Sequence, residues 1–324
     1  MQENRFSARR CPACGHQQHT PLFELPAHVF CEINSTYRRN YAELLGIDRE
    51  MNFPVVTCAS CAFVFAARLP DADFLNKVYD EVIDPDIGFR ESTSPGWVSH
   101  LLDMGSILLE QLARRRSSQP SRVLDFGCGY GSLVQAVNGP AVNAFGFETS
   151  PRRVEYLRKL GIAVLDSMDL VRKEAPFDAI VLSDVLEHVP DPADTLRMLH
   201  QLLRADGILL INVPNFNADM IAGVSGALQR KQAPSREVNP WEHLNYFSPA
   251  SLRSMLRAQG YAIVELRDRT SFGLRTDVQG WDYRRAGNVV KSLLRFVRAS
   301  AGAPVQTTTV VAQRVQPAQA DSAS

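Results

Sequence analysis

Four cysteines near the start of the chain have the residue type and spacing of a metal site. They form two C-x-x-C pairs, Cys11 with Cys14 and Cys58 with Cys61. Thiolates bind zinc in a tetrahedral arrangement, and four protein ligands leave no open coordination position. We therefore predict a structural zinc ion, with four free buried thiols as the competing interpretation. The alternative ligands nearby are Cys31, His16, His19 and His28.

A glycine-rich turn follows an expected buried strand. Residues 123–134 read VLDFGCGYGSLV and carry Gly127, Gly129 and Gly131. Glycines at a strand-to-helix turn let a ligand approach the backbone closely, and the helix beyond presents unpaired N–H groups. The spacing is G-x-G-x-G, because Ser132 stands where the dinucleotide fingerprint requires a glycine.

An acidic residue ends the next expected strand. Glu148 closes the run NAFGFE, 23 residues after Asp125. In nucleotide-binding folds an acidic residue about 20 residues on holds the ribose hydroxyls. A carboxylate can accept two hydrogen bonds from a diol, so this spacing favours a ribose-binding role for Glu148.

Aromatic, acidic and imidazole side chains crowd into residues 241–252, WEHLNYFSPASL. His243 is the candidate general base, because the unperturbed pKa of histidine lies near neutrality. Glu242 would orient His243 or hold a substrate hydroxyl, and Tyr246 would hydrogen-bond a developing enolate oxygen. The competing interpretations are a pocket wall without catalysis, and a structural role in which Ser248 caps the next helix.

A second histidine, His188, lies in the run LEHV after another expected strand. The carboxyl ends of parallel strands are where ligands bind in such sheets. Both a role as the base and a role in the scaffold stay open for His188.

Alternating strands and helices position these residues. The expected strands between residues 122 and 213 are RVLDFG, NAFGFE, AVLD, FDAIVLS and GILLINV, and the clearest helix is PADTLRMLHQLLRADG. This alternation indicates a parallel sheet with helices on both faces. A helix, SPASLRSMLRAQGY, and two further strands, YAIVELRD and TTTVVAQRV, follow after a long excursion at residues 214–240.

Motif by motif, residues 123–213 resemble the class I methyltransferases that depend on S-adenosylmethionine (SAM). The resemblance implies an α/β, Rossmann-like fold with a seven-stranded, mostly parallel sheet, and SAM as the cofactor. It implies that Asp125 faces the methionine end of SAM and that Gly127 and Gly129, with Gly131 in the same loop, make room for it. Glu148 would hold the ribose hydroxyls.

The same resemblance assigns three further residues. Asp166 and Ser167 follow the run AVLD and would lie beside the adenine. Ser183 ends the run FDAIVLS and would lie near the methionine and the sulfonium.

A cysteine-paired N-terminal segment before such a domain resembles the zinc-binding region of sugar C-methyltransferases. Those enzymes act on nucleotide-linked keto-sugars, and a Glu-His pair lies near the reacting carbon. The resemblance covers residues 11 to about 265 and implies a small-molecule acceptor, favouring a sugar or nucleotide-linked sugar. Methylation of carbon beside a ketone first requires removal of a proton, which is the role expected for His243.

The chain has 324 residues, enough for about two domains. We expect a zinc-binding N-terminal segment at 1–69, a helical linker that covers the cofactor at 70–120, a methyltransferase domain at 121–315 and a disordered tail at 316–324. Tyr79 and Trp97 are candidates for the cover. Residues 271–306 are irregular, with one expected helix, GNVVKSLLRFVRA.

Charge and hydropathy narrow the function classes. Basic and acidic residues both number 35, so the net charge is zero and nucleic acid is a disfavoured partner. No run approaches the ~20 apolar residues of a membrane span, and the polar N-terminus lacks a signal-peptide core. We therefore expect a cytoplasmic protein with reduced thiols. The sequence indicates no oligomeric state.

Two alternative functions stay open. An RNA methyltransferase with a zinc module would usually carry an Asn/Asp-Pro-Pro-aromatic motif, where this chain has SDVL at residues 183–186. A non-catalytic SAM-binding protein is the other, although an intact glycine loop and Glu148 indicate that cofactor binding is kept.

Overall fold

The structure is a computed structural model, and it describes residues 5–31, 40–115, 119–232, 234–239, 241–271 and 305–315. The expected helix within 272–304 and the tail at 316–324 lie outside the described residues, as does the side chain of Cys31. Among the helices that are described, none has the length and apolar character needed to cross a membrane.

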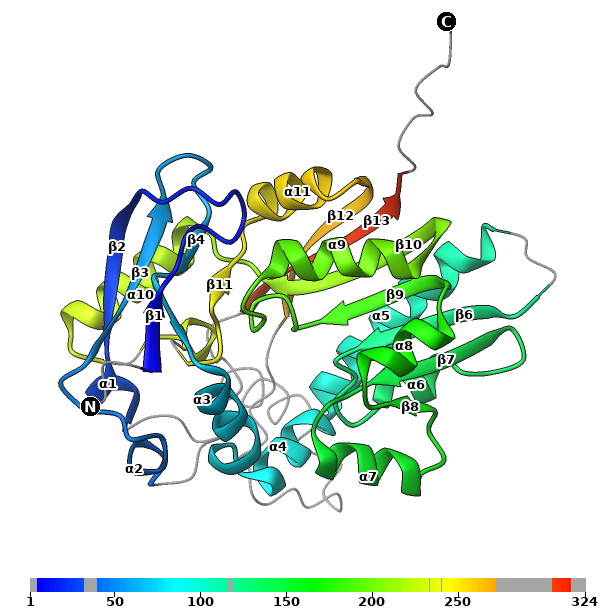
Figure 1. Cartoon of the computed structure of the whole chain (residues 1–324), viewed down its shortest axis with the longest axis horizontal. Coiled ribbons are helices and arrows are strands. Elements are labelled where there is room, and N and C mark those ends of the chain that lie inside the picture. The colour runs from blue at the N-terminus through cyan, green and yellow to red at the C-terminus, as the bar shows by residue number, and fades with distance from the viewer. Residues whose placement is uncertain are drawn as a thin grey trace, which may run out of the picture.

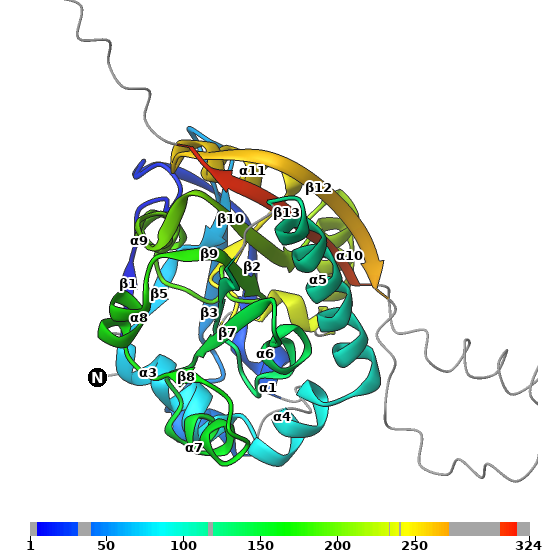
Figure 2. The ribbon, with the colours of Figure 1, turned by 90° about the vertical axis from the view of Figure 1, so that its right-hand side faces the viewer.

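A seven-stranded sheet forms the centre of the molecule (Figures 1 and 2). Its order is β12-β13-β10-β9-β6-β7-β8, and the five strands from β10 to β8 pair in parallel. β13 runs antiparallel between β10 and β12. This confirms the predicted mostly parallel, Rossmann-like sheet. The strands are β6 Ser121–Phe126, β7 Val142–Phe147, β8 Val164–Leu165, β9 Phe177–Ser183, β10 Leu203–Pro214, β12 Tyr261–Ser271 and β13 Val305–Arg314.

Helices cover both faces of this sheet, because successive side chains of a strand point to opposite sides. In β9, Ala179 and Val181 pack with one set of helices, while Ile180 and Leu182 pack with the other. The first set is α5 Pro95–Ala113, α6 Ser132–Val137 and α7 Pro151–Lys159. The second set is α8 Met168–Glu174, α9 Pro192–Leu202 and α11 Pro249–Ala258.

A four-stranded antiparallel sheet, ordered β11-β4-β3-β2, stands beside the central sheet (Figure 1). Its strands are β2 His19–Pro26, β3 Asn52–Cys58, β4 Val64–Ala66 and β11 Asn245–Tyr246. β11 lies in the C-terminal half of the chain and pairs with β4, with Asn245 opposite Phe65 and Tyr246 opposite Val64. The N-terminal segment and the predicted acceptor segment therefore share one sheet.

Smaller elements complete the N-terminal part and lead into the central sheet. They are β1 Phe6–Ala8, which pairs with β5 Arg68–Pro70, then α1 Ala27–Cys31, α2 Tyr41–Leu45, α3 Ala72–Lys77, the π-helix η2 Val78–Val82 and α4 Pro85–Ser92. Residues 70–115 are thus largely helical. Asp71 and Ser94 cap α3 and α5 by accepting from the backbone N–H groups of Phe74 and Trp97. The boundaries at 69 and 120 stay predictions.

Two elements differ from the sequence-based expectation. The helix expected through residue 207 ends at Leu202, because Leu203 already pairs with Phe177 at the start of β10. Within 214–240 the chain forms a helix, α10 Ala218–Gln229, followed by the short 3₁₀ helix η3 Arg236–Val238. Two glycines argued against that helix, yet an Asn217 cap and the burial of Val224 hold it in place.

Candidate active site

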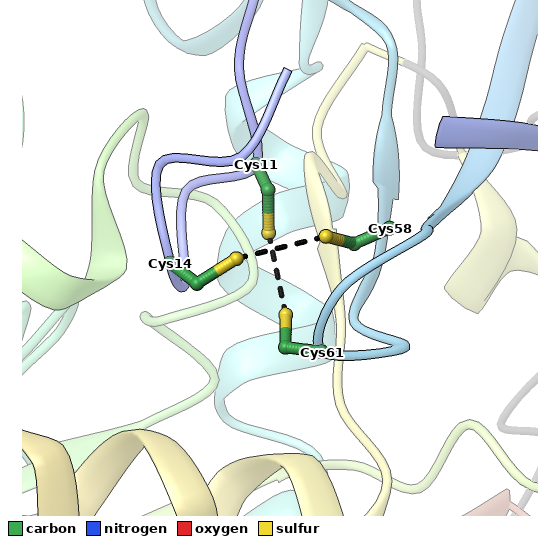
Figure 3. A group of neighbouring side chains, drawn as sticks. All are labelled: Cys11, Cys14, Cys58 and Cys61. Carbon is green, nitrogen blue, oxygen red and sulfur yellow. Dashed lines mark hydrogen bonds between the residues drawn. The ribbon is translucent and has the colours of Figure 1, made fainter. Parts of the chain in front are cut away.

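The two cysteine pairs converge on one point (Figure 3). The Sγ atoms of Cys11 and Cys61 are 3.6 Å apart, as are those of Cys14 and Cys58, and all four lie within 4.8 Å of one another. Zn–S bonds of about 2.3 Å in a tetrahedron require S···S distances of about 3.8 Å. A disulfide would need about 2.05 Å, so the arrangement fits a tetrahedral ion and not a disulfide.

Both pairs are shaped by the same backbone turn. The Gly15 N–H donates to the Cys11 carbonyl and the Ala62 N–H to the Cys58 carbonyl, and both donors have positive φ, 73° and 58°. A positive φ costs an alanine about 1 kcal/mol or more, so contacts with the surrounding structure must hold the turn at Ala62 in place. The ligand cluster in the described residues leaves out the alternatives His16, His19 and His28.

The three glycines of the loop between β6 and α6 all have positive φ: 82° at Gly127, 56° at Gly129 and 76° at Gly131. Their surroundings differ. A Cβ on Gly129 would meet nothing within 4 Å, so this position faces open space. A Cβ on Gly131 would lie 2.6 Å from Leu157, and one on Gly127 would lie 2.8 Å from Val185. A ligand can therefore approach the backbone closely at Gly129. At Gly131 and Gly127, the missing side chain lets other parts of the protein pack against the loop.

We expect two alanine substitutions in this loop to separate these roles. Gly131→Ala should lower the free energy of unfolding by about 2–4 kcal/mol, because the strain of a positive φ adds to the displacement of Leu157. Gly129→Ala should cost about 1–2 kcal/mol of stability but weaken SAM binding at least about tenfold. Chemical denaturation and titration calorimetry measure the two effects. Unchanged SAM affinity in Gly129→Ala would contradict the assignment of this loop.

Asp125 and Glu148 lie at the carboxyl ends of adjacent strands and are both buried. The Glu148 carboxylate accepts from the N–H groups of Thr149 and Ser150, each at 2.9 Å, and pairs with Arg153 at 3.3 Å. Burial, with the Glu148 charge as a second cause, raises the pKa of Asp125 to about 7. The two carboxylates thus make an acidic, partly charged patch beside Gly129.

The raised pKa of Asp125 predicts a pH dependence of stability. Unfolded aspartate loses its proton near pH 4, whereas folded Asp125 keeps it to about pH 7. Between these values the folded state binds more protons, so this residue's contribution to stability falls as pH rises, by up to ~1.4 kcal/mol per pH unit. Chemical denaturation of the wild type and Asp125→Asn at pH 4 to 8 gives the free energy of unfolding of each protein. The value for the wild type should fall relative to that for Asp125→Asn as pH rises through this range. A constant difference between the two proteins would rule the shift out.

The other predicted cofactor residues have protein partners. Asp166 pairs with Arg158 at 2.7 Å beside an open groove of about 610 Å³ along α7, and Ser167 caps α8. The Ser183 hydroxyl lies 3.2 Å from Nε2 of His100, which α5 brings over the strand ends. His100 was not predicted from the sequence, because only the packing of α5 reveals its position.

Two histidines meet at the predicted acceptor site. The rings of His188 and His243 lie edge to face, with centroids 4.6 Å apart. Nδ1 of His188 is 2.9 Å from the Glu242 carbonyl oxygen, and Nδ1 of His243 is 2.6 Å from that of Glu237. A carbonyl only accepts, so these contacts assign the proton to Nδ1 of each ring and the basic lone pair to Nε2.

The remaining predicted acceptor residues surround this pair. The Glu242 carboxylate accepts from Asn239 at 2.9 Å, so the contact that Glu242 makes with His188 is through its backbone. Tyr246 is 3% exposed, and burial raises the pKa of its hydroxyl. Tyr79 of the helical segment places its hydroxyl 3.1 Å from Nδ1 of His188.

Arg9 joins the cysteine site to the acceptor site and was not predicted. Its guanidinium donates to the carbonyl oxygens of Pro190 and Leu244 and to Oδ1 of Asn245, at 3.1, 3.0 and 2.7 Å. Asn245 in turn donates to the carbonyl oxygens of Leu186 and Val189, on either side of His188. Burial lowers the pKa of Arg9 to about 10, which still leaves it charged at neutral pH.

Glu187 is a third residue that was not predicted from the sequence, although it adjoins His188. It is 1% exposed, and its carbonyl oxygen accepts from the N–H groups of Leu244 and Asn245 at 2.7 and 3.1 Å. Ligand-type atoms of Glu187, His188 and His243 lie within 4.8 Å of one another.

Comparisons with known proteins show the family of the chain. Residues 101–266, just over half of the chain, match the family described as "Methyltransferase domain". The ubiquinone biosynthesis O-methyltransferase of Xylella fastidiosa (strain M23) is 28% identical over 214 residues, covering 59% of this chain and 86% of the relative. The corresponding enzyme of Azotobacter vinelandii is 30% identical over 156 residues, covering 45% of this chain and 66% of the relative.

Two solved methyltransferase structures are similar to this chain at lower sequence identity. The plantazolicin methyltransferase BpumL in complex with SAH is 15% identical with a TM-score of 0.47, covering 74% of this chain and 94% of that one. The 1,6-didemethyltoxoflavin-N1-methyltransferase of Burkholderia thailandensis is 16% identical with a TM-score of 0.48, covering 80% and 98%. On the family match, the chain belongs to the methyltransferase domain family, and it is a SAM-dependent methyltransferase of class I.

Proposed function

We propose that the enzyme methylates a carbon or oxygen atom of a sugar or nucleotide-linked sugar. The observation that carries this proposal is the contact between His188 and His243, with centroids 4.6 Å apart, beside the buried groups Glu187 and Tyr246. A base with its lone pair on Nε2 next to a buried hydroxyl suits proton removal from an acceptor atom. The named relatives are O-methyltransferases, which supports a hydroxyl group as the acceptor.

The cofactor assignments are part of the same proposal. SAM supplies an activated methyl group when it is bound. Gly129 leaves room beside the backbone, Glu148 is held in place to accept from a diol, and Asp125 offers a carboxylate to a cationic group. Gly127 and Gly131 belong to the same cofactor loop and shape it by letting Val185 and Leu157 pack closely against it. We assign the adenine side to Asp166 and Ser167, and the methionine side to Ser183.

His243 would remove the acceptor proton at Nε2. His188 supports the His243 ring by edge-to-face contact, and Tyr246 donates to the oxygen on which negative charge develops. Glu242 orients His188 through its carbonyl group. Because the methyl donor is already activated, proximity and one positioned base account for most of the chemistry required.

We also propose zinc at Cys11, Cys14, Cys58 and Cys61. The convergence of the four Sγ atoms supports a closed, structural site rather than a catalytic one.

An acceptor screen tests the function. Purified protein would be incubated with SAM and a panel of nucleotide-linked keto-sugars, nucleotide-linked hydroxy-sugars and phenols, and each product examined by mass spectrometry for one added methyl group. A methylated sugar is the expected result. If only phenols gain a methyl group, or if no sugar does while SAM still binds, the sugar proposal is wrong.

A further inference from the structure

A small, partly enclosed cavity lies beyond the carboxyl ends of β9 and β10. Its volume is about 10 Å³, and its wall includes Glu187, Asn215, Phe216, Glu237, His243 and Tyr246. A space of this size holds about one water molecule or one oxygen atom of a ligand. The candidate base His243 therefore forms part of the wall of a single-atom pocket.

Three buried polar groups in this wall have no hydrogen-bond partner in the described part of the chain. They are both carboxyl oxygens of Glu187, Oδ1 of Asn215 and the hydroxyl of Tyr246. These residues are 1%, 5% and 3% exposed. Buried polar atoms in folded proteins are nearly always paired, so several unpaired atoms around one cavity indicate a missing partner.

We propose that this cavity takes one uncharged oxygen of the acceptor, a hydroxyl or a ketone, next to the atom that receives the methyl group. This proposal deepens the proposed function and rests on it. Tyr246 would donate to that oxygen and Oδ1 of Asn215 would accept from a hydroxyl, while Glu187 would do either. His243 lies in the same wall, so the base and the oxygen site adjoin each other.

The charge of the wall disfavours an acceptor group that is already anionic before the reaction, such as a phosphate or a carboxylate. Two acidic residues, Glu187 and Glu237, contribute to the described wall, and no lysine or arginine does. Burial, with the Asp184 carboxylate as a second cause, raises the pKa of Glu187 well above its ordinary value. This shift favours the protonated carboxylic acid, which can donate a hydrogen bond, as Tyr246 can.

Stability and turnover should move in opposite directions on substitution in this wall. Tyr246→Phe and Glu187→Met remove unpaired buried polar atoms at nearly constant volume, so the midpoint of thermal unfolding without acceptor should stay level or rise. In these two variants, kcat/KM for a methylated acceptor should fall by at least about tenfold. In Glu187→Gln, which keeps a hydrogen-bond donor and an acceptor, kcat/KM should fall less.

Tyr261→Phe is the matched control. The Tyr261 hydroxyl is also buried, but it donates to the Leu196 carbonyl oxygen at 2.9 Å outside the cavity. Its removal should lower the unfolding midpoint by about 2 °C and leave kcat/KM unchanged.

Three results would overturn the proposal. Loss of stability in Tyr246→Phe and Glu187→Met equal to that of the control would show that a structural water occupies the cavity. A second bound metal ion per chain that disappears in Glu187→Met would show a metal site made with His188 and His243. Unchanged kcat/KM in both variants would show that the acceptor does not enter. If the wild type methylates no acceptor, the proposed function fails. The comparison of unfolding midpoints with the Tyr261→Phe control still shows whether a structural water occupies the cavity.

Discussion

Treatment with a strong chelator is expected to lower the thermal unfolding midpoint of the whole chain by more than about 10 °C. The cysteine site is not separate from the methyltransferase sheet. Cys11 and Cys58 pack in the same buried cluster as Leu124 of β6 and Phe247 before α11. Structural zinc contributes about 10–16 kcal/mol of binding free energy to small modules, so its loss should disturb that shared core.

The effect should extend to the acceptor site through Arg9, which is two residues from Cys11 and bonds Leu244 and Asn245. Hydrogen exchange of the Leu244 and Asn245 amides, which donate to the Glu187 carbonyl oxygen, should become faster after metal removal. Amides in α6, whose buried side chains pack in a different cluster from Cys11 and Cys58, serve as an internal reference.

Single cysteine variants supply the control for metal removal. Cys61→Ser should lose the metal and show the same fall in midpoint, whereas Cys128→Ser, outside the cluster, should keep one metal ion and remain sensitive to the chelator. Metal content is measured by elemental mass spectrometry. A metal-free protein with an unchanged midpoint would show that the four thiols are structural without an ion.

The sequence predicts the central sheet well because its signals are local. Apolar runs at 121–126, 142–147 and 177–183 alternate with helices, which is the pattern of a parallel sheet. The cysteine cluster is predictable for a similar reason, since each C-x-x-C pair forms within one turn.

The acceptor site could be predicted only in part, because long-range contacts build it. His243 stands out by residue type, but the pairing of β11 with β4 depends on packing between segments about 180 residues apart. Arg9 reaches Asn245 across 236 positions, and neither residue has a pattern that marks the other. The unpaired carboxyl group of Glu187 is visible only once its neighbours are known.

The largest expected loss of activity is that of His243→Asn. Removal of a positioned general base typically lowers turnover by about 10²–10⁴-fold. The affinity for SAM should be unchanged, because His243 lies in the acceptor wall and not beside Gly129. Initial rates on the methylated acceptor and titration calorimetry with SAM measure the two quantities, and His19→Asn, an exposed histidine of β2, is the matched control.

His188→Asn distinguishes the base from its neighbour. Burial lowers the pKa of His188 to about 4, so this ring is neutral from about pH 5 upward. A fall in kcat/KM toward acid pH that occurs above pH 5 therefore cannot come from protonation of His188. This acid limb should persist in His188→Asn, and kcat/KM should fall less in this variant than in His243→Asn. Loss of that limb in His188→Asn, with His243→Asn still active, would reverse the two assignments and make His188 the base. The separation works because burial keeps His188 neutral, while the hydrogen bond to the Glu242 carbonyl fixes the orientation of its ring against the His243 ring.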